Sequence, residues 1–174
     1  MKSFTPSKLI IVVYVALFMA KFPGNTYSAP KLIETTCKAT SHYDLCVKTL
    51  QSDPGSSRAD VKGLANIAAR GLFNQGMATW NKIYEMLQKT KDLELKKPFL
   101  TCLKAYSTIT VDDMNQAFSS LTRGNPKEAI SGFSDVLKQT EKCEKSFRKS
   151  PFTSDNKLVN DLAEVVISIA KNFL

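Results

Sequence analysis

The side chains able to do chemistry are few, and a single histidine, His42, limits what they could catalyse. A Ser-His-Asp or Cys-His nucleophile system would need that histidine, and so would a metal site built on imidazole. The chain has no Gly-Lys dipeptide and no GxGxxG motif, which excludes the usual phosphate-binding and dinucleotide-binding loops. We therefore expect a binding or inhibitory protein rather than an enzyme, and we expect no cofactor.

Four carboxylates could act in general acid–base chemistry: Asp112, Asp113, Glu141 and Glu144. Such a pair must be held about 5–10 Å apart in a pocket, whereas these stand among lysine and glutamine at helical spacing. The pattern favours solvent-exposed helix faces. A di-iron bundle would need Glu-x-x-His repeats, which the sequence around His42 lacks. We predict no metal site and expect His42 to be an ordinary residue at a turn or helix start.

The segment at residues 123–128 (RGNPKE) is the most informative candidate site. Asn125 is predicted to be the N-cap of a helix, Pro126 its first residue, and Glu128 a capping-box partner that reaches back to the cap. These roles do not explain Lys127, because a cation in the first helical turn opposes the helix dipole. A lysine on a rigid hairpin tip could enter an acidic cleft of another protein.

The N-terminus is typical of a secretory signal peptide. Twelve apolar residues at 9–20 follow a basic start, and they are too few to span a bilayer of about 30 Å. We predict a signal peptide at 1–28, with cleavage after Ser28. Its removal would take away three lysines and no acid, which lowers the formal net charge from +8 to +5. No basic run is interleaved with aromatic residues, so we expect no nucleic-acid partner, and no membrane association after cleavage.

The four cysteines all follow the predicted cleavage site, and an oxidising compartment favours two disulfides. Of the three possible connectivities, we favour Cys37 with Cys46, nine residues apart across a predicted turn. In that case Cys102 would pair with Cys143. These two flank a break at Gly124, and in an antiparallel helix pair they would lie at similar heights. Zinc binding is the alternative, although neither pair has CxxC spacing.

The remaining pattern is helical. The chain of 174 residues is 43% hydrophobic with only 7 Gly and 7 Pro, and apolar residues recur at a period near 3.6. We predict an all-α fold: a helical hairpin at 29–56, then an up-down-up-down four-helix bundle at 57–174. Breakers at 53–57, 97–98, 124–125 and 150–151 should separate the elements. Gly71 and Gly76, inside the longest helix, predict a close helix crossing. Trp80 is expected in the core, with a ligand pocket inside the bundle as the alternative.

The sequence resembles the plant invertase inhibitor and pectin methylesterase inhibitor family over essentially the whole predicted mature chain. The cysteines and their flanking residues carry the resemblance. The matching segments are ETTCK at 34–38, YDLCVKTL at 43–50, SDP at 52–54, ADVKGLA at 59–65, LTC at 100–102, AY at 105–106 and CEKSF at 143–147. The resemblance implies a four-helix bundle after a helical hairpin, with the first two and the last two cysteines paired.

The resemblance also implies a target-binding site. Invertase inhibitors of the family occupy the sucrose site of the enzyme with a Pro-Lys-Phe motif at a helix start. Pro126 and Lys127 match this motif, and Glu128 stands where the family has the aromatic residue. Pectin methylesterase inhibitors instead carry Gly-Asp-Tyr-like sequence there and bind through bundle faces. We therefore expect a 1:1 complex with a plant acid invertase, in the cell wall or vacuole, with pectin methylesterase as the alternative target.

Overall fold

The structure, a computed structural model, describes residues 29–174, and the predicted signal peptide lies outside the described residues. The chain begins with α2 (Ala29–Lys38), α3 (Tyr43–Gln51) and a short 3-10 helix, η1 (Pro54–Arg58). The bundle follows, and its elements are α4 (Val61–Lys89), α5 (Leu93–Ser107), the π-helical segment η2 (Thr108–Asp113), α6 (Met114–Arg123), α7 (Pro126–Lys145) and α8 (Thr153–Phe173). Within the described part, no helix is long and apolar enough to cross a membrane.

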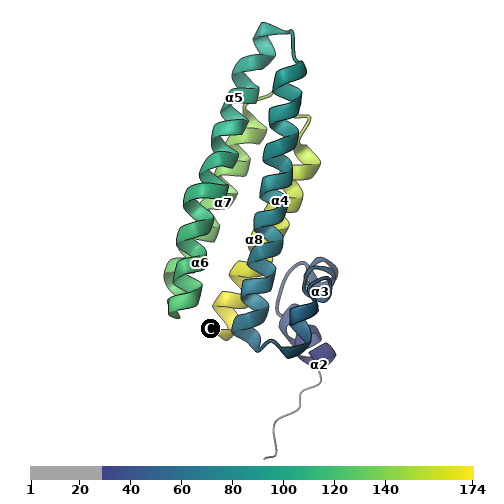
Figure 1. Ribbon diagram of the computed structural model, residues 1–174, viewed down its shortest axis with the longest axis vertical. Coiled ribbons are helices and arrows are strands. Elements are labelled where there is room, and N and C mark those ends of the chain that lie inside the picture. The colour runs from purple at the N-terminus through teal and green to yellow at the C-terminus, as the bar shows by residue number, and fades with distance from the viewer. Residues whose placement is uncertain (1–28) are drawn as a thin grey trace, which may run out of the picture.

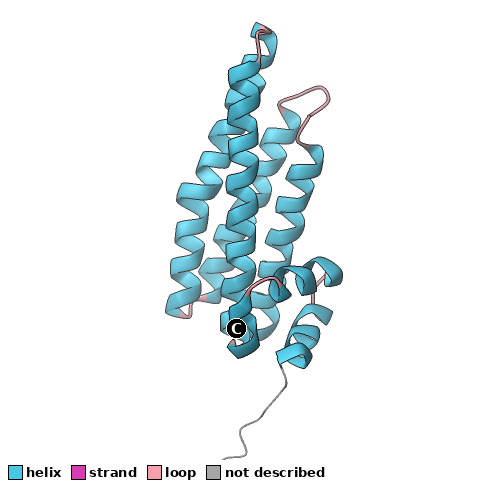
Figure 2. Ribbon diagram, turned by 45° about the vertical axis from the view of Figure 1, so that its right-hand side comes forward, coloured by secondary structure: helices cyan, strands magenta, loops and turns pink. Residues whose placement is uncertain are grey.

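The bundle runs up, down, up and down, as predicted. Its second leg is the continuous stretch α5–η2–α6, and the other legs are α4, α7 and α8 (Figure 1). The turns from α4 to α5 and from α7 to α8 lie at one end. The turn from α6 to α7 lies at the other end, where the α2–α3 hairpin packs against α4 and α8 (Figure 2). The two ends therefore expose different loops, and the candidate site at residues 123–128 lies at the hairpin end.

The starts of α4 and α5 are set by aspartate side chains that accept backbone N–H groups. The Asp60 carboxylate accepts from the Gly63 N–H at 2.7 Å and begins α4, and the Asp92 carboxylate accepts from the Glu94 N–H at 2.9 Å and begins α5. Such caps satisfy donors that have no partner within the helix, and each stabilises the helix by about 1 kcal/mol.

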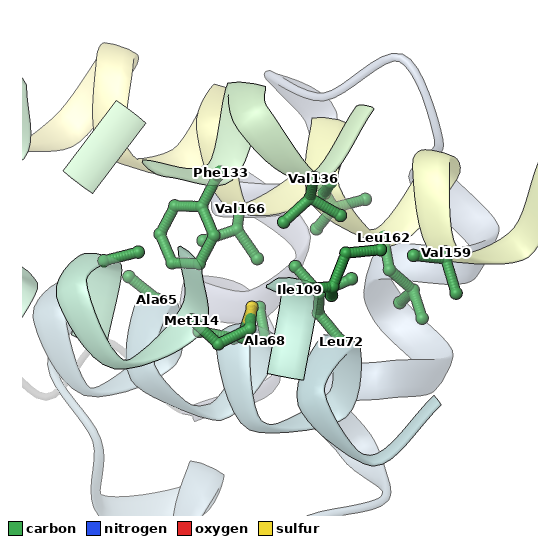
Figure 3. Close-up of a cluster of buried hydrophobic side chains, with 14 of the residues drawn as sticks. Ala65, Ala68, Leu72, Ile109, Met114, Phe133, Val136, Val159, Leu162 and Val166 are labelled. Atoms are coloured by element: carbon green, nitrogen blue, oxygen red, sulfur yellow. The ribbon is translucent and has the colours of Figure 1, made fainter. Parts of the chain in front are cut away.

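The core is formed by apolar side chains from every leg (Figure 3). Small residues on α4 let the neighbouring helices approach it closely, and larger side chains from the other legs fill the remaining space. The central residues are Ala65, Ala68, Leu72, Ile109, Met114, Phe133, Val136, Val159, Leu162 and Val166, and each is at most 5% exposed.

Both disulfides form with the expected pairing. Cys37 and Cys46 join the two helices of the hairpin, with their Cα atoms 5.5 Å apart. Cys102 of α5 and Cys143 of α7 are joined across the bundle, with their Cα atoms 4.3 Å apart. All four cysteines are buried and none is free, so the zinc alternative is excluded.

Of the two glycines predicted to mark a close crossing, Gly71 does so and Gly76 does not. A Cβ atom on Gly71 would lie 2.6 Å from Cγ2 of Thr49, so Gly71 lets α3 of the hairpin approach α4. A Cβ on Gly76 would lie 3.4 Å from Cγ2 of Thr110 in η2, which is an ordinary van der Waals distance, so this contact does not require a glycine. The close approach at this helix is therefore between α3 and α4, at Gly71.

The predicted break at residues 97–98 is wrong. Pro98 lies inside α5, which begins five residues earlier, and the break between the first two legs is at residues 90–92. Proline removes one backbone hydrogen bond. The Asp92 cap and a run of strong helix formers from Leu93 to Lys97 keep the turn before it helical. The second leg also contains a π-helical segment, at the β-branched run that begins at Thr108.

Candidate functional site

The corner between α6 and α7 reverses the chain through two residues. Gly124 adopts a left-handed conformation, with φ of 75°, and ends α6. Its N–H donates to the carbonyl of Leu121 at 3.1 Å, and the Asn125 N–H donates to the carbonyl of Ser120 at 2.8 Å. Glycine reaches this conformation without the steric cost that a Cβ imposes. The corner is therefore a tightly hydrogen-bonded turn.

The start of α7 follows the predicted pattern. The side chain of Asn125 accepts from the Glu128 N–H at 3.3 Å, and Pro126 occupies the first helical position. Proline is favoured there because its missing N–H would have no helical partner. Lys127 is thus the second residue of α7, and its side chain is exposed.

The Glu128 side chain turns back towards α6, but its hydrogen-bond partner differs from that of the predicted capping box. The backbone N–H of Asn125 is taken by Ser120, so the Glu128 carboxylate instead accepts from the side-chain amide of Asn125 at 3.0 Å. The same carboxylate oxygen lies 3.6 Å from a guanidinium nitrogen of Arg123. The negative charge of Glu128 is therefore offset by a cation on the preceding helix.

Lys127 is the cation of this corner that has no counter-charge. Within residues 29–174 its ammonium group has no ion pair and no side-chain hydrogen bond, whereas Arg123 is engaged with Glu128. The dipole of α7 also opposes a positive charge in the first turn. The corner therefore presents an ammonium group that is unpaired within the described residues, and an external anion would be attracted to it.

The corner is supported from behind by close packing and one long-range hydrogen bond. A Cβ atom on Gly132 of α7 would lie 3.0 Å from Cβ of Ala117 on α6, so the two helices nearly touch. The Lys62 ammonium group of α4 donates to the carbonyl of Thr122 at 3.0 Å, close to the end of α6. These contacts hold the corner against the body of the bundle.

The expectation that the acidic residues are simply solvated is correct for Asp112 and Glu141 and wrong for the other two. Asp112 and Glu141 are exposed, and Glu141 pairs with Lys145. Asp113 is half-buried in η2. Burial, followed by the neighbouring carboxylates of Asp135 and Asp112, raises its pKa to about 6. No local pattern predicts this, because Asp135 lies on α7 and far from Asp113 in the sequence.

Glu144 is held by hydrogen bonds at the other end of the bundle. It accepts from the hydroxyl of Thr153 and the amide of Asn156, both at 2.6 Å. Burial opposes its ionisation, but these hydrogen bonds outweigh that effect and lower its pKa. Asn156 in turn accepts from the buried Tyr106 hydroxyl at 2.7 Å. Glu144 therefore helps to join α5, α7 and α8.

His42 has a role that the sequence did not reveal. It stands at the start of α3, as expected, and its Nε2 atom also lies 2.7 Å from a carboxylate oxygen of Glu164 on α8. A sequence separation of 122 residues explains why no local pattern predicts this contact.

Trp80 is half-buried, and its indole N–H donates to Ser107 at 2.9 Å. Within the described residues, no group of three or more metal-ligating side chains gathers.

Comparisons with known proteins agree on one family. The family described as plant invertase/pectin methylesterase inhibitor matches residues 31–172. A relative from Arabidopsis thaliana, named cell wall / vacuolar inhibitor of fructosidase 1, is 34% identical over 143 residues, which cover 82% of this chain and 69% of the relative. A pectinesterase inhibitor from Actinidia deliciosa is 29% identical over 170 residues, covering 94% of this chain and 90% of the relative.

The fold agrees as well. The crystal structure of a mutant form of a pectin methylesterase inhibitor from Arabidopsis superposes with a TM-score of 0.68 at 18% identity, covering 80% of this chain and 95% of that chain. At this identity the match shows a shared fold rather than a shared target. The family match spans both disulfides, the hairpin and all four legs of the bundle. The chain belongs to the plant invertase/pectin methylesterase inhibitor family.

Proposed function

We propose that the protein inhibits a plant acid invertase by inserting the corner between α6 and α7 into the active site of the enzyme. The observation that carries the proposal is the charge arrangement of the corner: Lys127 is exposed and has no counter-charge, while Glu128 is turned back towards Arg123. The relative named as an inhibitor of fructosidase supports this choice of target.

The electrostatics of the target suit this arrangement. A retaining glycosidase holds two catalytic carboxyl groups about 5–5.5 Å apart, and an ammonium group placed between them would be attracted to both. Glu128 would be repelled by the same carboxylates if it pointed into the cleft, but its contacts with Asn125 and Arg123 keep it against α6. Pro126 fixes the backbone before Lys127 and so sets where the ammonium group lies.

The test is a charge reversal with a matched control. Lys127→Glu should raise the inhibition constant for a plant acid invertase at least about tenfold, which corresponds to about 1.4 kcal/mol. Lys142→Glu makes the same change in net charge on an exposed lysine of α7 near the opposite end, and it should leave the constant within about twofold. Far-UV circular dichroism of both variants checks the fold. Equal constants for Lys127→Glu and the unmodified protein would rule out the lysine as the inserted group.

Pectin methylesterase is the second candidate target, because the relative from Actinidia deliciosa is named a pectinesterase inhibitor and matches over 94% of this chain. Titrating both enzymes with the same protein preparation separates the two. We expect invertase activity to fall to its minimum at one equivalent of inhibitor, which would establish the 1:1 complex. Inhibition of pectin methylesterase alone, with invertase unaffected at micromolar protein, would assign the other target.

The same proposal places the protein outside the cytosol, in the cell wall or the vacuole. Two disulfides suit an oxidising compartment. We further propose residues 1–28 as the signal peptide and 29–174 as the mature inhibitor domain. Mass spectrometry of the protein secreted by plant cells should then give an N-terminus at Ala29, and retention of residues 1–28 would contradict cleavage after Ser28.

A further inference from the structure

The charge of the described chain is unevenly distributed between the two ends of the bundle. We define the basic end as residues 82–104 and 141–157, which form the turns from α4 to α5 and from α7 to α8 and the adjoining helix segments (Figure 2). It carries 11 basic and 6 acidic side chains. The rest of residues 29–174 carries 10 of each. The whole net charge of the predicted mature chain, +5, therefore lies at the end opposite the corner that contains Lys127.

Most of the acids at the basic end already have partners. Glu85 lies 3.8 Å from the ammonium group of Lys89, and Asp155 lies 2.6 Å from that of Lys82. Glu141 pairs with Lys145, Asp92 caps α5, and Glu144 is held by Thr153 and Asn156.

Seven cations at this end are exposed and have no ion pair or side-chain hydrogen bond within the described residues. Three lie in the two turns and four in the adjoining segments of α5 and α7, so they are not confined to a single helix. They are Lys91, Lys96, Lys97, Lys104, Lys142, Arg148 and Lys149.

Exposed leucines alternate with lysines on the outer face of α5. Leu93 is 74% exposed and Leu100 is 54% exposed, and the spacing of Leu93, Lys97, Leu100 and Lys104 places all four on one side of the helix. The two leucines are about 10 Å apart along the axis at 1.5 Å per residue. This face therefore alternates apolar and cationic groups instead of presenting a continuous apolar surface.

We propose that the basic end binds an acidic polysaccharide that carries a carboxylate on successive sugars. Cations spread over two turns and the adjoining helices suit a long chain with repeated charges better than a small anion, which needs converging donors. The C–H faces of sugar rings can cover Leu93 and Leu100 between the charged contacts. A membrane surface fits less well, because interfacial helices present a continuous apolar face to the lipid. The basic end is remote from Lys127, so this proposal does not rest on the invertase assignment.

The test compares two polymers with the same sugar backbone, one with free carboxylates and one with uncharged methyl esters. Polygalacturonate should bind the protein, and the same polymer with its carboxyls fully methyl-esterified should bind at least about tenfold more weakly. Affinity for polygalacturonate should also fall steeply between about 20 mM and 200 mM salt, because each bound cation displaces a counterion from the polymer. Equal affinity for the two polymers would overturn the proposal.

Matched variants locate the site. Replacing Lys96, Lys97, Arg148 and Lys149 by Gln removes four cations from the basic end, and replacing Lys38, Lys48, Arg58 and Lys171 by Gln removes four exposed cations from the rest of the chain. The first variant should lose at least about tenfold in affinity for polygalacturonate and the second less than about threefold. Equal losses would show that net charge alone, rather than the basic end, determines binding.

Two further measurements separate this proposal from its alternatives. Vesicles of phosphatidylcholine with one fifth phosphatidylserine should not sediment the protein under the conditions in which polygalacturonate binds it. Tighter binding to the vesicles than to the polymer would overturn the proposal in favour of a membrane surface. The basic-end variant should keep the inhibition of the target enzyme that the unmodified protein shows, so a failed inhibition assay and a failed polymer assay remain distinguishable.

Discussion

At the scale of single residues, Asp113 is a carboxyl group whose surroundings disfavour its charged form. Its Oδ2 atom is buried and has no hydrogen-bond partner within the described residues. Asp112 lies next to it in η2, and Asp135 faces it from α7 together with Lys138, which is hydrogen-bonded to Asp135 at 2.6 Å. Burial and the two carboxylates together favour the neutral form and raise the pKa from 3.8 to about 6. Asp113 therefore binds a proton more tightly in the folded protein than in the unfolded chain.

This shift predicts a loss of stability as the solution becomes less acidic. The contribution of Asp113 is fully present below about pH 4 and disappears as the pH rises through about 6, because the unfolded chain ionises first. After allowance for partial solvent exposure, we expect a loss of about 1 kcal/mol. Asp113→Asn should remove this part of the pH dependence. Urea unfolding of both proteins from pH 4 to 7 measures it, and parallel curves would contradict the assignment.

Tyr106 and Asn156 give a second prediction for single residues. The buried Tyr106 hydroxyl donates to Asn156 at 2.7 Å, and Asn156 donates to Glu144, so Tyr106→Phe would leave a buried carbonyl oxygen without its donor. The expected cost in free energy of unfolding is about 1–3 kcal/mol. Tyr43→Phe, at a side chain that is 39% exposed, is the control and should change stability by less than about 0.5 kcal/mol. Similar values for both variants in chemical denaturation would exclude a role for the buried bond.

At the scale of helices, local breakers predicted the breaks near residues 53–57, 124–125 and 150–151, and the two errors have different causes. Asn125 and Pro126 begin α7 as predicted, because a cap and a first-turn proline act within a few residues of sequence. Pro98 was a misleading signal, since the Asp92 cap and the strong helix formers from Leu93 to Lys97 keep the turn before it helical. The direction of the Glu128 side chain could not be predicted, because it depends on Arg123 and on Ser120 taking the Asn125 N–H. Contacts made across helices are absent from any local pattern.

Gly71 tests the packing between the hairpin and the bundle. Its absent Cβ leaves room for Thr49 of α3, so Gly71→Ala should destabilise the protein even though alanine has the higher helix propensity. When Thr49→Ala removes the clashing methyl group, the same Gly71→Ala change should instead stabilise it by about 0.5–1 kcal/mol. A double-mutant cycle by thermal or urea unfolding gives the coupling between the two sites. Additive effects would mean that residues 71 and 49 are not in close contact between α4 and α3.

At the scale of the whole molecule, the two disulfides restrict the unfolded chain to different extents. The bond between Cys37 and Cys46 closes a loop with a sequence separation of 9, and the bond between Cys102 and Cys143 closes one of 41. Chain-entropy arguments give the longer loop about 4 kcal/mol of stabilisation and the shorter about 3 kcal/mol. Both bonds are buried, so each also contributes packing to its surroundings.

The positions of the disulfides predict different consequences for the fold. Replacing Cys102 and Cys143 by Ala should lower the stability of the whole bundle, because the bond joins the second leg, at α5, to the third leg, α7. Replacing Cys37 and Cys46 by Ala should instead increase amide hydrogen exchange mainly in α2 and α3, since that bond lies within the hairpin. The corner that contains Lys127 belongs to the bundle, and enzyme inhibition should therefore be more sensitive to the first pair of substitutions near the unfolding temperature. Exchange that rises equally throughout the chain in both variants would mean that hairpin and bundle unfold as one cooperative unit.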